Sequence, residues 1–205
     1  MAERPPREII LGKAGELFHR QGYGSVSLEE IIAGSGLSKA QFYQNYTTKS
    51  SLGAAWLKRL ARRMELVNKD FLEKTTDNDR LLRKYFLSMR SWVEANQFRS
   101  CQFANTAACY DSDSAAELFD LIDQYKRAQR DFFISIAERL VGDRDAQRIG
   151  TAVFLLYSGA MTECQNLKAL WPLEDALVTA EQLCGVEARP LPAATGMTRP
   201  PFGST

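Results

Sequence analysis

Apolar residues recur at helical spacing along almost the whole chain. Between Arg7 and Gln21, for example, Ile10, Ala14, Leu17 and Phe18 fall on one face of a helix. No segment shows the alternation of apolar and polar residues that is typical of a half-buried strand. The pattern therefore predicts an all-α protein of about nine helices, with no internal repeat.

Turn residues and cap formers divide this pattern into separate helices. Gly22-Tyr23-Gly24 ends the first helix, and Thr75–Asn78 ends a long one. Proline at position 172 suits the first turn of the last helix. The expected helices are Arg7–Gln21, a short one from Leu28 to the Gly34 turn, Lys39–Tyr46, Lys49–Lys74, Asp79–Ala95, Cys101–Tyr110, Ser114–Val141, Asp145–Leu170 and Leu173–Cys184.

Two of the predicted short helices begin with the same signal. Ser27 is followed three residues later by Glu30, and Ser38 three residues later by Gln41. Both pairs match the capping box, in which serine and its partner side chain satisfy each other's backbone N–H groups. The glycine-containing turn Gly34-Ser35-Gly36-Leu37 lies between them. This stretch predicts a helix-turn-helix, and we take it as the functional centre.

Composition and charge agree with a DNA-binding protein that has a substantial core. The 205 residues are 45% hydrophobic and 25% charged. Residues 1–60 carry eight Lys or Arg and five Asp or Glu, whereas residues 61–205 carry eighteen and twenty. No stretch approaches the roughly 20 apolar residues that span a bilayer, and MAERPPREII lacks the apolar run of a signal peptide. We therefore expect a cytoplasmic protein with no membrane partner.

Three regions follow from these observations. Residues 7–50 form the expected helix-turn-helix domain, and residues 51–187 form a larger ligand-binding and dimerisation domain. Residues 188–205 hold four of the seven prolines and little apolar periodicity, which predicts a disordered tail.

The N-terminal region resembles a known family. The residues that carry the resemblance cover about positions 7–55, in register: Arg7, Ile9-Ile10, Ala14, Leu17-Phe18, Gly22-Tyr23, Ser27, Ile31, Gly36-Leu37-Ser38, Phe42-Tyr43, Tyr46, Lys49 and Leu52. They resemble the TetR family of bacterial transcriptional regulators. The chain has Asn45 where the family commonly has a histidine, and Tyr46 where it has phenylalanine, so the contact made at Asn45 stays open.

The resemblance implies a homodimer that binds a palindromic double-stranded DNA operator, most commonly as a repressor. It places the helix that begins at Lys39 in the major groove, where Lys39 and Gln41 are candidates for base edges and Ala40 for a thymine methyl group. Gln44 is a candidate for a base or a phosphate. Ser27, Ser38, Tyr43, Tyr46 and Lys49 are candidates for phosphate contacts. Ser27 and Ser38 also cap helices, and a purely packing role for Tyr43 is the alternative.

The resemblance also implies that two copies pair through the last two long helices, here Asp145–Leu170 and Leu173–Cys184. The face expected to pair holds Ala152, Leu155, Leu156, Gly159 and Ala160. The alternative is that this face packs within one monomer. One helix-turn-helix reads only a few base pairs, so a dimer that contacts two half-sites is expected on geometric grounds as well.

A small, largely hydrophobic effector is expected to bind the regulatory half and release the DNA. The candidate ligand-binding residues are Phe86, Met89, Trp92, Cys101, Phe103, Phe132, Phe133, Tyr157 and Met161. The alternative is that these rings are ordinary core. Cys101 follows Arg99 and begins a predicted helix, two features that favour a reactive thiolate. A repressor that senses oxidants or electrophiles through Cys101 is therefore an alternative function.

Other classes of function have little support in the sequence. The chain has one histidine, His19, expected on the surface of the first helix, and four cysteines without a CxxC spacing. We expect no enzymatic activity, no metal and no cofactor. A helical interaction protein that does not bind DNA is the remaining alternative, and the basic N-terminal segment with Lys39, Gln41 and Lys49 argues against it.

Overall fold

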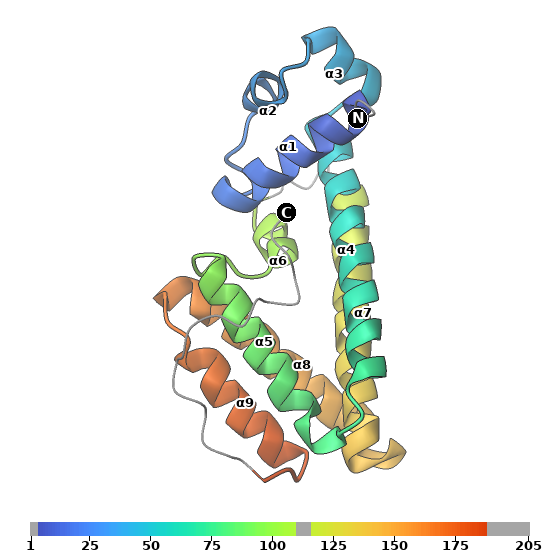
Figure 1. The fold of residues 1–205 in the computed structure, drawn as a ribbon, viewed down its shortest axis with the longest axis vertical. Coiled ribbons are helices and arrows are strands. Elements are labelled where there is room, and N and C mark those ends of the chain that lie inside the picture. Colours follow the sequence, from blue (N-terminus) through green and yellow to red (C-terminus); the bar gives the residue numbers. More distant parts are fainter. Residues whose placement is uncertain (1–3, 110–115, 188–205) are drawn as a thin grey trace. The chain divides into compact units, whose positions relative to one another are not determined.

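The computed structural model of the chain describes residues 4–109 and 116–187. Within these residues the chain forms nine α-helices, one short 3-10 helix and no strand, so the all-α prediction is confirmed (Figure 1). The contacts divide the helices into two compact units. The first contains residues 4–63, 102–109 and 116–125, and the second contains residues 64–101 and 126–187.

The helices have the following bounds: α1 Pro6–Gln21, α2 Leu28–Ser35, α3 Lys39–Asn45, α4 Lys49–Lys74, the 3-10 helix η1 Asn78–Arg80, α5 Leu81–Ala95, α6 Gln102–Ala107, α7 Ala116–Val141, α8 Asp143–Leu167 and α9 Trp171–Leu183. The boundary between the two units falls inside α4 and inside α7. This division follows packing, whereas the domain boundary expected at residue 50 follows the end of the helix-turn-helix pattern.

Several predicted bounds differ from the observed ones. The helix expected from Asp79 begins at Leu81, after the 3-10 turn. The helix expected over Asp145–Leu170 starts and stops earlier, because Gly142 occupies the N-cap and Lys168 adopts a left-handed conformation with φ 52°. Tyr110, Ser114 and the expected tail 188–205 lie outside the described residues.

The first unit has a small apolar core where α1 packs against α2 and α3. Ile10, Ile31 and Phe42 are fully buried there, and each such side chain contributes about 1.5–3 kcal/mol by leaving water. The Phe18 ring lies 5.1 Å from the ring of Tyr23 and 5.1 Å from that of Trp56. This packing attaches α1 to the first half of α4 and so holds α2 and α3 in place.

The second unit is organised around α9, which packs along both α5 and α8 (Figure 1). Two ion pairs join α5 to α9. Arg83 donates from Nε and Nη2 to both carboxylate oxygens of Glu181, at 2.8 Å each, and Arg90 donates to Glu174 at 2.7 Å. Glu181 is only 1% exposed. A buried carboxylate is tolerated here because a two-pronged guanidinium neutralises and hydrogen-bonds it.

The C-terminal end of α4 is held by a side chain from α7. Arg139 donates to the carbonyls of Leu72 and Thr75, at 3.0 and 2.7 Å, and to Asn78 Oδ1 at 2.9 Å. The last carbonyls of a helix lack partners within the helix, and a cation at this end also complements the helix dipole. The end of α4 is therefore fixed by a residue more than 60 positions away. Among the described helices, none has the combination of length and apolar character needed to cross a bilayer.

Candidate functional site

Both predicted capping boxes are present. The Ser27 N–H donates to Glu30 Oε2 at 2.7 Å, and the Glu30 N–H donates to Ser27 Oγ at 3.2 Å. The same reciprocal pair joins Ser38 and Gln41, at 2.9 and 3.2 Å. Gly36, between the two helices, adopts φ 70°, a left-handed conformation that glycine reaches without a Cβ clash. Local sequence therefore fixes the start of both helices and the turn that joins them.

Helix α3 has one buried and one exposed side. Phe42 is fully buried and packs edge-on against the ring of Tyr43. Lys39, Ala40, Tyr43 and Gln44 are exposed. The spacing of these four positions places them on one side of the helix, opposite Phe42. The exposed side therefore offers a cation, a methyl group, a phenol and an amide to a partner.

Gln41 is also exposed, but its side chain is already in use. Its Oε1 accepts the capping bond from the Ser38 N–H. A two-pronged contact with adenine needs both the oxygen and the nitrogen of the amide. Base reading by Gln41 would therefore require the capping bond to be released or shared.

Tyr46 and Asn45 point to structural roles in the described conformation. Tyr46 is 3% exposed, and its hydroxyl is buried without a hydrogen-bond partner among the described residues. The Arg7 guanidinium lies 4.6 Å from its ring centre and donates to the Asn45 carbonyl at 3.2 Å. The Asn45 amide donates back to the Gln41 carbonyl at 2.8 Å. A phosphate contact from Tyr46 would need its hydroxyl to become exposed, which the other candidates do not require.

Lys49 lies at the first position of α4, as predicted, and it is half-buried. Its Nζ donates to the Gly24 carbonyl at 3.3 Å and lies 4.7 Å from the centre of the Tyr23 ring. Burial lowers the pKa of this lysine. Thr48 caps the same helix end by accepting the Ser51 N–H at 3.0 Å. Lys49 thus ties the chain after α1 to the start of α4 and also places a cation near Glu30 of α2.

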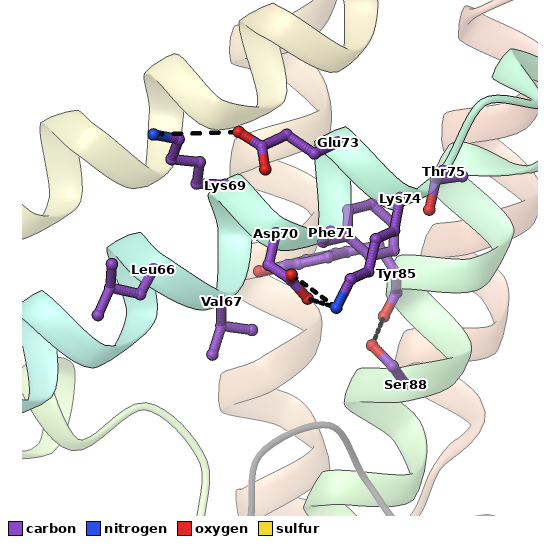
Figure 2. A pocket seen from close by; sticks show the side chains of 10 residues that line it. All are labelled: Leu66, Val67, Lys69, Asp70, Phe71, Glu73, Lys74, Thr75, Tyr85 and Ser88. Carbon is purple, nitrogen blue, oxygen red and sulfur yellow. Dashed lines mark hydrogen bonds and ion pairs between the residues drawn. The ribbon is translucent and has the colours of Figure 1, made fainter.

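The second unit contains a hollow of about 640 Å³ between the C-terminal half of α4 and α5 (Figure 2). Leu66, Val67 and Phe71 of α4 line it, with Tyr85 and Ser88 of α5. None of these residues is among the candidates for ligand binding predicted from the sequence. Leu66 is 59% exposed. Its position away from the apolar face of α4 is the one feature of the sequence that could have indicated an exposed apolar side chain here.

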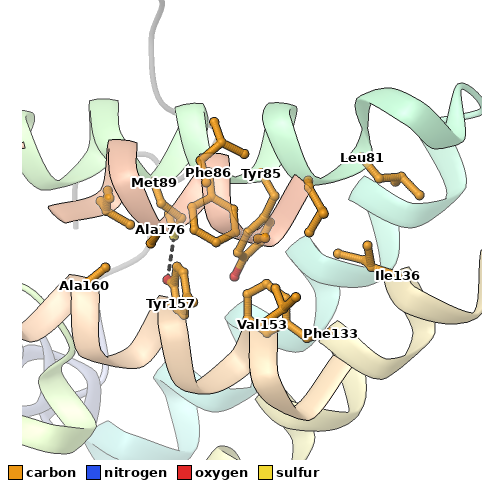
Figure 3. Packing of buried hydrophobic residues seen from close by; sticks show 14 of the residues in the cluster. Leu81, Tyr85, Phe86, Met89, Phe133, Ile136, Val153, Tyr157, Ala160 and Ala176 are labelled. Atoms are coloured by element: carbon orange, nitrogen blue, oxygen red, sulfur yellow. Dashed lines mark hydrogen bonds between the residues drawn. The ribbon is translucent and has the colours of Figure 1, made fainter. Parts of the chain in front are cut away.

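Most of the predicted ligand-binding residues come together in the buried core of the second unit as a packed aromatic cluster (Figure 3). The Tyr85 ring lies 4.8 Å from Phe132, 5.4 Å from Phe133 and 5.6 Å from Tyr157. The Tyr157 hydroxyl donates to Met89 Sδ at 3.0 Å. The six predicted residues buried in this cluster are Phe86, Met89, Phe132, Phe133, Tyr157 and Met161.

Three candidates lie elsewhere. Trp92 is only partly buried against the cluster. Phe103 belongs to α6 in the first unit, where it stacks on Tyr125 at 3.6 Å, and so it does not join the other rings. Cys101 directly precedes α6 and carries a half-buried free thiol.

Arg7 was not among the site residues predicted from the sequence. Its side chain contacts Asn45 and Tyr46 and so connects α1 to the end of α3. No local sequence pattern indicates this role.

A family comparison matches the segment that contains α2 and α3. Residues 10–55 match the family model described as bacterial regulatory proteins, tetR family. The matched segment runs from the middle of α1 to the first turns of α4.

Similarity to known proteins extends over nearly the whole chain. The transcriptional repressor NemR of Escherichia coli strain K12 is 22% identical over 201 residues, which cover 91% of this chain and 97% of NemR. A TetR-family regulator from Streptomyces coelicolor has a similar solved structure, with a TM-score of 0.79 at 20% identity over 88% of this chain and 94% of that one. The reduced form of Escherichia coli NemR gives a TM-score of 0.73 at 19% identity, over 87% and 97% of the two chains.

Proposed function

This chain belongs to the TetR family of bacterial transcriptional regulators, and from that premise we propose that it is a repressor released from its operator by a small hydrophobic effector. A homodimer binds the operator through α3 and its symmetry mate. The effector binds the second unit and lowers the DNA affinity. Operator DNA lies in the bacterial cytoplasm, where this function would be exercised.

The exposed side of α3 carries the proposal. The capping boxes of α2 and α3 fix where the two helices begin, and the burial of Phe42 fixes which side of α3 faces outward. Lys39 offers a donor suited to guanine, and Ala40 a methyl group suited to thymine. Tyr43 and Gln44 extend the same face, and Ser27, Ser38 and Lys49 lie at helix starts where phosphates are readily bound.

A DNA-binding titration tests this proposal. The intact protein is titrated against labelled DNA from upstream of its own gene, at 50 and 200 mM salt. We expect retardation that weakens steeply with salt, because phosphate contacts release counterions. Lys39→Ala should weaken binding by about tenfold, as expected for the loss of a base or phosphate contact. Lys69→Ala, an exposed lysine on α4 in the second unit, is the matched control and should bind normally. No retardation of the wild-type protein at low salt would refute the proposal.

We propose that the dimer forms through the outer faces of α8 and α9. Leu155 and Leu167 on α8 and Trp171 and Leu183 on α9 are 61%, 51%, 53% and 39% exposed. A Cβ built on Gly159 would meet nothing within 4 Å, so a partner helix could approach closely there. The face predicted from the sequence is divided: Leu155 and Gly159 point outward, whereas Ala160 is buried and Leu156 packs against the core. For the dimer to bind a palindromic operator, its two copies of α3 must lie about 34–36 Å apart, the spacing of successive major grooves.

Release follows from a shift between two conformations. The effector favours the conformation in which the reading helices are wrongly spaced, and it shifts the balance only by its difference in affinity for the two states. Helix α4 is suited to report this change, because it begins at Lys49 beside the reading helices and its C-terminal half lines the hollow.

A thiol trigger is the second candidate. Cys101 is free and half-buried, and Cys109 is free and exposed. In this version an oxidant or an electrophile modifies Cys101 and produces the release. Cys101→Ser should then retain DNA binding and lose release by hydrogen peroxide. Unchanged release in that variant would remove the thiol mechanism and leave the effector mechanism standing.

A further inference from the structure

The first unit contains a groove between α1, the end of α2 and the first half of α4. Its volume of about 720 Å³ lies within the range of about 300–1,000 Å³ that is typical of small-molecule sites. All the residues that line this groove belong to the first unit, and none of the residues proposed to contact DNA is among them. The groove is therefore a feature of the first unit that the proposed DNA contacts do not use.

Three of the residues that line the groove are glycines. A Cβ built on Gly12 would meet nothing within 4 Å, so this position opens directly onto free space. A Cβ on Gly15 would lie 3.2 Å from Cδ1 of Trp56, and a Cβ on Gly34 would lie 2.5 Å from Cε of Lys13. Larger residues at these positions would therefore fill the groove or displace the side chains that form its walls.

The apolar part of the lining comes from α1 and α4. Leu11 and Trp56 are nearly buried, and Ile9 and Leu60 are half-buried. The indole N–H of Trp56 makes no hydrogen bond to the described residues, and Nε1 lies on the edge of the ring that faces Gly15. The groove can thus cover an apolar ring, and it contains one donor that the described residues leave unused.

Basic side chains outnumber acidic ones around the groove. Four of the residues that line it are Lys or Arg, and two are Glu. Both carboxylates are already paired: Glu8 with Arg59 at 2.9 Å, and Glu16 with Lys13 at 2.9 Å. An excess of two positive charges remains in the lining, which favours an anion over a neutral molecule or a cation.

We propose that this groove binds a small organic anion, a carboxylate on an apolar ring, with the ring against Trp56 and the carboxylate among the basic side chains. The proposal adds a second small-molecule site to the proposed function, and it places that site in the unit that carries α3. Ser35, the last residue of α2, lines the groove, and its hydroxyl accepts the Leu37 N–H at 3.3 Å. A bound anion would therefore contact the turn that leads to α3.

A pair of matched probes tests the preference for an anion. Indole-3-acetate and indole-3-acetamide share one ring and nearly one shape, but only the first is charged at neutral pH. Binding to the isotope-labelled full-length protein is followed by NMR, through the amide signals of Gly12, Gly15 and Gly34 and the indole N–H signal of Trp56. These signals should shift together, and the acetate should bind about fivefold more tightly, as expected for partly exposed ion pairs. Inorganic phosphate, which has the charge without the ring, should bind more weakly than the acetate.

Two pairs of variants locate the site. Gly12→Phe places a ring in the groove and should abolish binding of both indole probes, whereas Gly12→Ala leaves most of the space and should bind them normally. Arg63→Glu should weaken binding of the acetate by at least about fivefold and leave binding of the amide nearly unchanged. Arg62→Glu is the matched control, because Arg62 is the neighbouring exposed arginine of α4 and does not line the groove. It should bind the acetate normally.

Several results would overturn the inference. They are equal affinity for the two indole probes, phosphate binding as tight as that of the acetate, normal binding by Gly12→Phe, and probe-induced shifts confined to the second unit. Thermal melting checks that Gly12→Phe is folded, and it should melt close to the wild-type temperature because position 12 is exposed. If that variant does not fold, the comparison of Arg63→Glu with Arg62→Glu decides, and equal loss of acetate binding in both would refute the site.

Discussion

Gln41 carries two roles that can be separated by substitution. Its side-chain oxygen completes the capping box of α3, and its position places it among the candidates for base contact. Glutamate performs the same capping role at Glu30. Gln41→Glu should therefore keep the helix start and introduce a negative charge on the side of α3 that we propose contacts DNA.

We expect Gln41→Glu to weaken operator binding by more than about tenfold, since a carboxylate is repelled by phosphates and loses the amide donor. Its free energy of unfolding should stay within about 0.5 kcal/mol of wild type. Ser38→Ala is the complementary control, because it removes the cap and should cost about 1 kcal/mol. Wild-type DNA affinity in Gln41→Glu would show that this side of α3 does not meet DNA.

The two capping boxes should respond differently to acid. Hydrogen bonds from the backbone N–H and the hydroxyl of Ser27 hold the pKa of Glu30 below its ordinary value of 4.5. A carboxylate with a depressed pKa contributes fully above the unfolded value, and the contribution is lost as the pH falls through the folded value. Gln41 does not titrate, so the cap at Ser38 has no such loss.

Backbone amide NMR between pH 6 and pH 3.5 measures this difference. The Ser27 amide signal should shift with the protonation of Glu30 below pH 4.5, while the Ser38 signal stays nearly constant. Glu30→Gln should remove the pH dependence at Ser27. Equal shifts at both serines, or a shift that persists in Glu30→Gln, would contradict the assignment.

At the scale of elements, the contact between α7 and α8 depends on one missing side chain. A Cβ built on Gly150 would lie 2.5 Å from Ile134 Cα and 2.8 Å from Ile134 N. Both are backbone atoms, so the clash cannot be relieved by a side-chain rotation. The two helices approach as closely as they do because position 150 is glycine.

Gly150→Ala should lower the free energy of unfolding by about 1–3 kcal/mol, the usual range for an overpacked core. Chemical denaturation checks the prediction. Gly12→Ala in α1 is the control, because its Cβ would meet nothing within 4 Å and alanine favours a helix by up to about 1 kcal/mol. A Gly150→Ala protein as stable as wild type would mean that α7 and α8 separate without loss.

Helix boundaries were predictable from the sequence where a recognised capping signal sets them, and they were misplaced where no such signal marks them. Ser27 and Ser38 began α2 and α3 as expected, because each capping bond spans three residues. The start of α5 was misplaced because Asn78 is held by Arg139 from α7. The end of α8 was misplaced because Lys168, rather than a glycine, adopts the left-handed conformation.

The candidate sites divide in the same way. The outward residues of α3 follow from helical periodicity once Phe42 is assigned to the core. Tyr46 is buried against Phe42 with the Arg7 guanidinium over its ring, and Phe103 packs with Tyr125 rather than with the other aromatic residues. The hollow was missed because its walls are set by how α4 and α5 approach, which no periodicity within either helix records.

At the scale of the whole molecule, the proposed DNA affinity depends on two copies acting together. A single helix-turn-helix contacts only a few base pairs, so a monomer should lose most of the operator affinity even with an intact α3. Leu155 is the most exposed large apolar side chain on α8. Because it makes little contact within its own chain, a charge at this position should affect association without affecting the fold.

Leu155→Glu should therefore shift the protein from dimer to monomer in sedimentation equilibrium at micromolar concentration, because two like charges meet across a symmetric interface from which water is excluded. The same variant should melt at the wild-type temperature at concentrations where both proteins are monomeric, and its operator affinity should fall by at least about a hundredfold. Phe119→Glu is the matched control, since it places the same charge on a 54% exposed apolar residue of the first unit, and it should remain dimeric. A Leu155→Glu protein that stays dimeric would exclude this face and move the search to the remaining exposed apolar residues. A monomer with undiminished operator affinity would instead mean that one copy of α3 is enough for recognition, which would contradict the palindromic operator while leaving the interface in place.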